Sequence, residues 1–398
     1  MTYTFEQARE CVLSKVAEFW SEPAIEAVPL TEASGRLLAE SICADRDYPP
    51  EARSVRDGFA VRPNDLPGTL EIIGEVRAGT TFEGTVQRGQ AVEIMTGAPM
   101  PAGAHSVVMV EHTVVENGRV RIDRSLDPGE NVNPRASEAK RGETLLSSRQ
   151  RISFAISALL ASVGRSCVRV YRKPNVAILA TGDEILPIDS TPLPHQIRNS
   201  NSYSLAAQVM GAGAIPQVLP IAKDEYESTR ALIEEGLRSD LLLLSGGVSA
   251  GRYDIVERVL ADLGAEFYFD RVLIQPGQPL VFGRAQDKFF FGLPGNPAST
   301  MVTFEIFARA AVELLGGAKD SLLPISWSRL SRDFKQKTGL RRFLPARLSP
   351  DGGEVDPIGW QGSGDIAAVA RSNAFLVTEP EREFWEKGEL IRVLCHTR

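Results

Sequence analysis

The chain has 398 residues, of which 43% are hydrophobic and 24% charged, and its formal net charge is −7. This length predicts two to four domains at roughly 100–200 residues each, and the apolar content excludes a disordered chain. No apolar run approaches the roughly 20 residues of a membrane span, the amino terminus lacks the pattern of a secretory signal, and no block of Lys and Arg marks a nucleic-acid groove. We therefore expect a cytoplasmic protein that binds neither membrane nor nucleic acid.

The first 45 residues are predicted to be mainly helical. The stretch Thr4-Phe-Glu-Gln7 has the form of a capping box, and the apolar residues after it recur at helical spacing. Thr31 is expected to cap a second short helix that runs through Leu38. Helix is predicted again at 153–163, where Gly164 is suited to end it.

Residues 46–139 differ in composition and are predicted to form a β-rich module. Gly and Pro separate short runs that favour strands, at 70–74, 91–95, 106–110 and 118–122.

Residues 174–318 alternate expected strands with expected helices, which indicates a three-layer α/β domain with a largely parallel sheet. The expected strands lie at 175–180, 217–221, 240–244, 265–269, 280–282 and 289–291, and the expected helices at 202–210, 224–237, 254–263 and 297–315. The remaining residues, 319–398, carry short strands and turns and predict a small β barrel.

Three polar, glycine-rich turns follow strands of the α/β domain, at Thr181–Glu184, Ser245–Gly251 and Gly292–Pro297. In open α/β sheets a ligand binds beyond the carboxyl ends of the strands, and glycines let the backbone approach it closely. Carboxylates beside a phosphate suit Mg²⁺, which prefers oxygen ligands; the candidates are Asp183, Glu184, Asp224 and Asp254. Any one of these turns is more often merely a turn, and any one carboxylate a helix cap, but three turns at corresponding strand ends favour a pocket.

Other motifs carry less information. The chain has neither a P-loop nor a dinucleotide-binding glycine motif. Its four cysteines form no C-x-x-C pair, which favours core residues in a reducing compartment, and His105 and His112 are more readily structural than catalytic. In the β-rich module, Ser54 and Asp57 lie beside Gly58, and Thr96 beside Gly97; each segment alone is more often a loop than a site.

Together, these motifs and their order resemble one family, the molybdopterin molybdenumtransferases, which comprise bacterial MoeA and the E domains of gephyrin-type proteins. The resemblance extends over nearly the whole chain. It is carried by the segments Ser54–Ala60, Met95–Pro99, Pro101–Met109, Thr181–Glu184, Ser245–Gly251, Gln275–Pro279, Gly292–Pro297, Gln361–Gly364 and Arg371–Ala374.

The resemblance implies four domains: a split, elongated helical domain (1–45 and 140–173), an inserted β-rich domain (46–139), the α/β molybdopterin-binding domain (174–318) and a C-terminal β barrel (319–398). It further implies a homodimer whose active site lies between the α/β domain of one subunit and the β-rich domain of the other. The implied reaction takes adenylyl-molybdopterin and molybdate, requires Mg²⁺, and yields molybdenum cofactor and AMP.

The resemblance also implies roles by position. Asp57, Glu184, Asp224 and Asp254 would be catalytic, and Asp224 and Asp254 would hold Mg²⁺. The residues implied to bind substrate are Ser54, Thr96, Asp183, Gly246, Gly247, Ser249, Arg271, Gln275, Gln278, Pro294, Gly295, Asn296, Ser299 and Ser372. Ser54, Asp57 and Thr96 would reach the site from the partner subunit, and Ser299 and Ser372 match positions near the molybdate pocket.

The chain departs from the family pattern at two places. The family often has Lys-Pro-Gly-Lys-Pro where this chain has Gln275 and Gln278, and glutamine donates hydrogen bonds but carries no charge. Arg271 keeps one basic group in reach along the chain. The family's arginine-rich segment reads Asn133–Glu138 here, where Arg135 and Glu138 are the candidate replacements. We therefore expect reduced molybdate affinity with the reaction kept.

Alternatives remain at this point. A molybdopterin adenylyltransferase shares the α/β domain but typically has Gly-Gly-Thr-Gly where this chain has Gly-Gly-Val-Ser. A non-catalytic, gephyrin-like scaffold is disfavoured because binding a peptide needs none of the retained aspartates. A preference for tungstate over molybdate, and contacts with an adenylyltransferase or with molybdoenzymes, are not decided by the sequence.

Overall fold

The computed structural model describes residues 1–246 and 255–396. Contacts divide the chain into two compact units, and each is described by itself. The first unit comprises Met1–Ala39, Arg151–Ser153 and the described part of Val168–Arg398, and the second comprises Glu40–Gln150 and Phe154–Cys167. The four-domain division of the chain, with its boundaries at 45, 139, 173 and 318, stays a prediction.

A seven-stranded sheet forms the centre of the first unit, in the order β1-β19-β21-β22-β18-β14-β17. Its neighbours pair in parallel except at β21, which is antiparallel to both β19 and β22. This confirms the largely parallel sheet. The strands are β1 (Thr2–Tyr3), β14 (Asn175–Ala180), β17 (Ile215–Val218), β18 (Leu241–Ser245), β19 (Glu266–Val272), β21 (Pro279–Ala285) and β22 (Lys288–Leu293).

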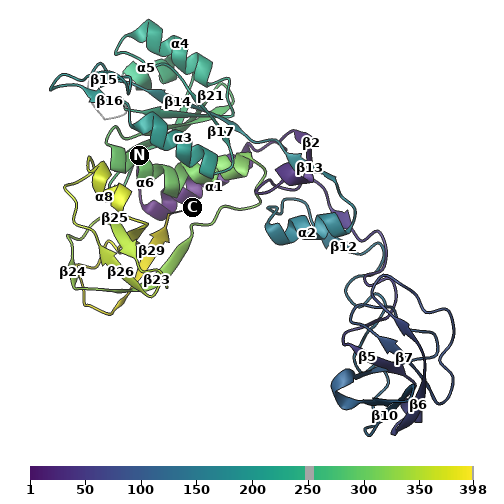
Figure 1. Cartoon of the computed structure of the whole chain (residues 1–398). Helices are drawn as coiled ribbons and strands as arrows, with labels where there is room; N and C mark the ends of the chain where they lie inside the picture. Colours follow the sequence, from purple (N-terminus) through teal and green to yellow (C-terminus); the bar gives the residue numbers. More distant parts are fainter. Residues whose placement is uncertain (247–254, 397–398) are drawn as a thin grey trace. The chain divides into compact units, whose positions relative to one another are not determined.

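Helices cover both faces of this sheet, so the predicted three layers are present (Figure 1). One face carries a long interrupted helix, in which α6 (Pro297–Thr303) and α7 (Arg309–Leu315) flank the π-helical turn η4 (Phe304–Ala308). The other helices on that face are α1 (Phe5–Glu18) and α3 (Asn201–Gly211); the opposite face carries α4 (Tyr226–Gly236) and α5 (Ile255–Asp262).

The helix α1 shows how the local sequence and the packing agree. The Thr4 side chain accepts from the Gln7 N–H and the Gln7 side chain accepts from the Thr4 N–H, which confirms the capping box. Ala8, Val12 and Val16 are buried against the sheet's core. The predicted second helix after Thr31 is wrong. Only a 3-10 turn, η1 (Leu30–Glu32), forms there in the described chain, because the following residues make β-bridges instead.

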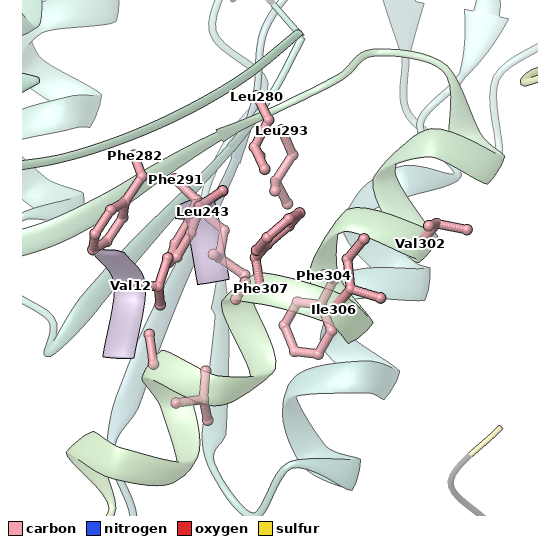
Figure 2. Close-up of a cluster of buried hydrophobic side chains, with 14 of the residues drawn as sticks. Val12, Leu243, Leu280, Phe282, Phe291, Leu293, Val302, Phe304, Ile306 and Phe307 are labelled. Carbon is pink, nitrogen blue, oxygen red and sulfur yellow. The ribbon is translucent and has the colours of Figure 1, made fainter. Parts of the chain in front are cut away.

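Aromatic side chains fill the core between the sheet and α1, α6 and α7. Phe282 and Phe291, from adjacent strands, stack with ring centroids 4.6 Å apart. Figure 2 shows them beside Leu243, with Phe304 and Phe307 presented by the helical layer. This close packing holds the strand ends, and so the turns that follow them, in a rigid frame.

The carboxyl-terminal part of the first unit is the predicted β barrel. Five strands close on themselves, because β25 pairs with both β26 and β27. The barrel strands are β23 (Ile325–Leu330), β25 (Arg341–Leu348), β26 (Glu354–Pro357), β27 (Ala374–Val377) and β29 (Leu390–Cys395), with the short elements β20 (Ile274–Gln275), β24 (Phe334–Lys335), α8 (Ile366–Arg371) and β28 (Phe384–Trp385) around them. Two further two-stranded pairs are β2 (Ile25–Pro29) with β13 (Cys167–Tyr171), and β15 (Ile185–Leu186) with β16 (Ile197–Arg198).

The second unit is built on a six-stranded sheet in the order β8-β5-β7-β6-β10-β9, which confirms the β-rich module. Its strands are β5 (Gly58–Val61), β6 (Gly68–Val76), β7 (Gln90–Ile94), β8 (Ser106–Met109), β9 (Val114–Glu116) and β10 (Arg119–Ile122). The unit also holds β3 (Ile42–Cys43), β4 (Arg53–Ser54), η2 (Pro63–Asp65), η3 (Val110–His112), β11 (Val132–Asn133), β12 (Thr144–Leu146) and α2 (Phe154–Ser162). As predicted, Gly164 follows α2 with a positive φ of 75°.

Among the described residues, no helix combines the length and the apolar character that crossing a bilayer requires.

The strand predicted at 217–221 lies earlier in the chain, at β17. Pro220 has no N–H with which to continue the ladder of hydrogen bonds.

Candidate functional site

A cavity of about 420 Å³ opens at the carboxyl ends of β14, β18 and β22, where the sequence places its three glycine-rich turns. This is the position at which open α/β sheets bind ligands. The lining residues are Ala180, Thr181, Gly182, Glu184, Ile185, Ile197, Arg198, Asn199, Ser200, Asn201, Asp224, Ser245, Gly246, Pro279, Pro294, Gly295, Asn296 and Pro297.

Backbone packing at the floor of the cavity requires glycine at position 246. The Thr181 N–H donates to the Ser245 carbonyl at 3.1 Å, which joins the ends of β14 and β18. Gly246 has a φ of 92°, and a Cβ there would lie 2.7 Å from the Thr181 carbonyl oxygen. Both facts exclude a side chain. A ligand can therefore approach the backbone here without a side chain in between.

Carboxylates lie on one side of the cavity. Glu184 and Asp224 line it, and Asp183 accepts a hydrogen bond from the Asp224 N–H at 3.2 Å. Asp224 is exposed to solvent, but partial desolvation of its carboxylate raises its pKa above the ordinary value, and the negative charges of Asp183 and Glu184 raise it further. A bound cation would neutralise part of this negative charge.

The two cavity carboxylates fit a Mg²⁺ ion. Mg²⁺ typically takes one or two carboxylates, waters and substrate phosphate oxygens rather than a full protein cage. The described residues contain no group of three or more His, Cys, Asp or Glu side chains arranged to hold a metal. Asp254, the other predicted metal ligand, lies outside the described residues.

Asn201, which no motif in the sequence marked, also lines the cavity. The Asn201 Nδ2 donates to the Ser245 Oγ at 2.8 Å and to the Gly295 carbonyl at 2.8 Å. It thereby ties the start of α3 to two of the glycine-rich turns. Because a carbonyl can only accept, the contact with Gly295 fixes the orientation of the amide. The sequence feature that could have indicated Asn201 is the polar run 198–202, which leads into α3.

Two buried polar atoms of cavity-lining side chains, the Asn201 Oδ1 and the Thr181 Oγ1, have no hydrogen-bond partner among the described residues. An unsatisfied buried polar atom costs roughly 1–3 kcal/mol, and such atoms call for an explanation. Both belong to side chains that line the cavity. This part of the protein is therefore built at a cost in stability, as is common in binding sites.

We expect Thr181→Val to stabilise the protein. The change removes a buried hydroxyl that makes no hydrogen bond with the described residues, so the free energy of unfolding should rise by about 1 kcal/mol. The matched control is Thr229→Val. The Thr229 hydroxyl, equally buried, donates to the Lys223 carbonyl at 2.9 Å, so this change should lower the free energy of unfolding by about 1–2 kcal/mol.

Denaturant unfolding followed by tryptophan fluorescence measures both changes, because all four tryptophans (Trp20, Trp327, Trp360 and Trp385) lie in the first unit. Equal destabilisation of the two variants would show that the Thr181 hydroxyl has a partner in solution.

The third turn connects the cavity to the barrel. Asn296 precedes α6 but makes no side-chain capping bond; its Nδ2 instead donates to the Ser363 Oγ at 2.9 Å. The Ala298 N–H donates to the Ser363 carbonyl at 2.9 Å. The loop 361–364 is thus fixed beside the cavity wall by two hydrogen bonds.

The structure brings six of the predicted site residues together around this cavity: Glu184, Asp224, Gly246, Pro294, Gly295 and Asn296. Asp183 is bonded to them through Asp224. Four others do not line the cavity, namely Arg271, Gln278, Ser299 and Ser372. Gln275 does not line it either, and its side chain contacts Arg342 of the barrel. Gly247 and Ser249 lie outside the described residues.

The remaining predicted residues lie in the second unit. Ser54 and Thr96 line a hollow of about 610 Å³ there. The Thr96 N–H and hydroxyl donate to the Asp57 carboxylate at 2.6 and 2.8 Å, and these bonds lower the pKa of Asp57 below its ordinary value. Arg135 pairs with Asp47 at 2.7 Å, and Glu138 accepts from the Asn133 amide at 3.1 Å.

Comparison with known families accounts for nearly the whole chain. Residues 3–164 match the family described as the MoeA N-terminal region (domain I and II). Residues 177–314, which hold most of the cavity, match a family described as a probable molybdopterin binding domain. Residues 328–395 match the MoeA C-terminal region (domain IV).

Individual relatives agree with these matches. A molybdopterin molybdenumtransferase of Bacillus subtilis is 35% identical over 396 residues, which cover 96% of this chain and 92% of the relative. One from a Nostoc species is 36% identical over 409 residues, with 96% and 91% covered.

Solved structures agree as well. Two structures of a molybdopterin biosynthesis MoeA protein from Pyrococcus horikoshii superpose with TM-scores of 0.78 and 0.85, at 31% and 26% identity. The superpositions cover 99% of both chains in the first case and 100% in the second. The fold, the order of the regions and the sequence thus agree over the full length, and this chain belongs to the MoeA family of molybdopterin molybdenumtransferases, the transferases of molybdenum cofactor biosynthesis.

Proposed function

We propose that this chain transfers molybdenum from molybdate to adenylyl-molybdopterin, releasing AMP and the molybdenum cofactor. One observation carries the proposal: the cavity at the strand ends lies in the region that matches a molybdopterin binding domain, and it combines carboxylates with exposed backbone. These are the groups that a phosphate-containing ligand bound with a divalent cation requires.

The residues of the cavity have distinct parts in this reaction. Gly246 and Gly295, where no side chain intervenes, let the phosphates approach the backbone. Asp224 and Glu184 would hold Mg²⁺, and the ion would supply positive charge to the phosphate oxygens. Asn201, fixed by Ser245 and Gly295, would help to orient the ligand. This arrangement would stabilise charge and fix the orientation of the ligand.

The proposal includes the homodimer and the cytoplasmic location that the resemblance implies. In this dimer Ser54, Asp57 and Thr96 of one subunit would approach the α/β cavity of the other. The two Thr96 donors lower the pKa of Asp57, which favours the ionised carboxylate that such a contact with a cation or a ligand donor would use. Contacts with an adenylyltransferase and with client molybdoenzymes stay predictions.

The test is AMP release from adenylyl-molybdopterin, measured with and without molybdate and with and without Mg²⁺, followed by reconstitution of an apo-molybdoenzyme. We expect AMP release that depends on both additions and a product that restores activity. Bound substrate without AMP release would contradict the proposal and favour a scaffold. Formation of adenylyl-molybdopterin from ATP and molybdopterin would favour the adenylyltransferase alternative.

A further inference from the structure

Arg198 is the one basic side chain among the described residues that line the cavity of the α/β domain. It belongs to β16, and it is exposed to solvent, so a ligand in the cavity can reach it. The carboxylates of Glu184 and Asp224 line the same cavity. The described part of this lining therefore carries both signs of charge, and its positive charge comes from a single arginine.

Backbone hydrogen bonds on both sides of Arg198 fix its place. The Ile197 N–H donates to the Glu184 carbonyl at 2.9 Å, and the Asn199 N–H donates to the Leu186 carbonyl at 2.8 Å. These bonds belong to the parallel pairing of β15 with β16. The Arg198 backbone is therefore held beside the turn that carries Glu184.

The Arg198 side chain is oriented by one hydrogen bond and is otherwise free. Its Nε donates at 2.8 Å to the carbonyl of Ser190, which lies in the loop between β15 and β16. Within the described chain, Nη1 and Nη2 have no hydrogen-bond partner. When an arginine is held through Nε, its two Nη groups form an edge that can donate two parallel hydrogen bonds to oxygens of one phosphate.

Other arginines of the α/β region already have carboxylate partners. The pairs are Arg172 with Asp240, Arg230 with Glu234 and Arg309 with Glu305.

Arg198 differs from these arginines, because it pairs with neither Glu184 nor Asp224 although all three line one cavity. Carboxylates alone would repel an anionic ligand. A cation bound at the carboxylates would remove that repulsion, and the unpaired guanidinium would attract the ligand. The charges of the cavity thus suit an anion that binds together with a cation.

We propose that Arg198 binds a phosphate group of the ligand in this cavity through Nη1 and Nη2, with its guanidinium positioned by the Ser190 carbonyl. The inference rests on the proposed function, in which the ligand is adenylyl-molybdopterin. It adds to the proposed Mg²⁺ ligands a residue of opposite charge that contacts the phosphate directly. An arginine suits this part because its planar fork matches two phosphate oxygens, whereas a lysine offers a single point of charge.

Isothermal titration of the full-length protein with AMP, and separately with inorganic pyrophosphate, both in the presence of Mg²⁺, tests the assignment. Arg198→Gln removes the charge and the paired Nη donors, and it should weaken binding of both probes at least about tenfold. Arg198→Lys should weaken it less, because the charge remains while the paired donors are lost. The matched control is Arg238→Gln. Arg238 is exposed in the same domain and does not line the cavity, so its loss should change affinity less than about twofold.

Unchanged AMP affinity in Arg198→Gln would overturn the assignment, and so would an equal loss in Arg238→Gln or a parent protein that fails to bind either probe. A loss with AMP but not with pyrophosphate would mean that Arg198 contacts the nucleoside, which also contradicts the proposal. Tryptophan fluorescence establishes that each variant is folded; if Arg198→Gln does not fold, Arg198→Lys against Arg238→Lys decides the question.

The proposed function fails separately from this inference. Weaker binding of AMP and pyrophosphate in the Arg198 variants, together with a parent that never releases AMP from adenylyl-molybdopterin, would leave the phosphate site standing and remove the transferase reaction.

Discussion

An Asp224→Asn variant should lose most of its AMP-releasing activity without becoming less stable. Asp224 lines the cavity beside Glu184 and is a proposed ligand of Mg²⁺. Removing one charged group from such a site costs on the order of 10²–10³-fold in kcat. The ionised carboxylate is at the same time weakly disfavoured in the folded protein, because partial desolvation and the charges of Asp183 and Glu184 raise its pKa; the effect is small because Asp224 is exposed to solvent.

The sign of the stability change follows from that raised pKa. Folding disfavours the ionised carboxylate, so the penalty is fully present above the folded pKa and disappears as the pH falls below the unfolded pKa. Asparagine carries no such penalty. The variant should therefore unfold at the same temperature as the parent or a higher one at pH 7, and the difference should vanish in acid. Thermal unfolding at several pH values measures this.

Glu227→Gln is the control for both effects, since Glu227 is an exposed carboxylate in the first turn of α4 and does not line the cavity. Its activity should stay within about twofold of the parent, as for most surface changes. Full activity of Asp224→Asn would show that the Asp224 carboxylate has no role in the reaction. A lower unfolding temperature at pH 7 would show that the carboxylate is a structural group.

Mixing Asp224→Asn with a second variant, Asp57→Asn, each of which we expect to be inactive alone, tests the proposed homodimer. If Asp57 reaches the cavity from the partner subunit, refolding Asp224→Asn together with Asp57→Asn should produce mixed dimers that contain one site with both aspartates. Part of the activity should then return. No recovery, with mixed dimers demonstrated, would mean that both aspartates must come from the same subunit.

Phe291→Ala should be among the most destabilising single substitutions in the first unit. Phe291 is fully buried in β22 and stacks on Phe282 with centroids 4.6 Å apart (Figure 2). Truncating a buried phenylalanine to alanine costs about 3–5 kcal/mol, because apolar contacts are lost and a cavity remains. Denaturant unfolding followed by the tryptophans of the first unit gives the free energy directly.

The same substitution at an exposed position provides the control. Phe154, at the start of α2 in the second unit, has 89% of its surface exposed, so Phe154→Ala should change the free energy of unfolding by less than about 0.5 kcal/mol; circular dichroism measures this, because the tryptophans lie only in the first unit. A loss below about 1 kcal/mol for Phe291→Ala would mean that the surrounding aromatic side chains close the cavity.

Much of the architecture was predictable from local patterns. Some features depend on only a few neighbouring residues, so the sequence alone predicts them. Examples are the capping box at Thr4, the apolar run that forms β18 and the glycine after α2. The three glycine-rich turns were likewise predicted, and their meeting at one cavity followed from the rule that parallel strands end at the same edge. The order of these motifs along the chain was enough to indicate the family.

Other features depended on packing between distant segments. Residues after η1 form bridges rather than the predicted helix, because their partners are Arg151 and Val170. Asn201 became a wall of the cavity only because α3 places it against Ser245 and Gly295. A polar run before a helix does not reveal such partners, which lie 44 and 94 residues away.

The sequence by itself determined the class of the elements, the family and the carboxylates that line the cavity. Helix caps, strand periods and turn glycines act over a few residues, and their physics is local. Only the tertiary structure decided which charged side chains have an oppositely charged partner. Gln275 and Arg342 are 67 residues apart, and the parallel pairing of β20 with β25 brings them together. Whether an arginine has a counter-charge depends on every segment packed around it, so no local pattern reveals it.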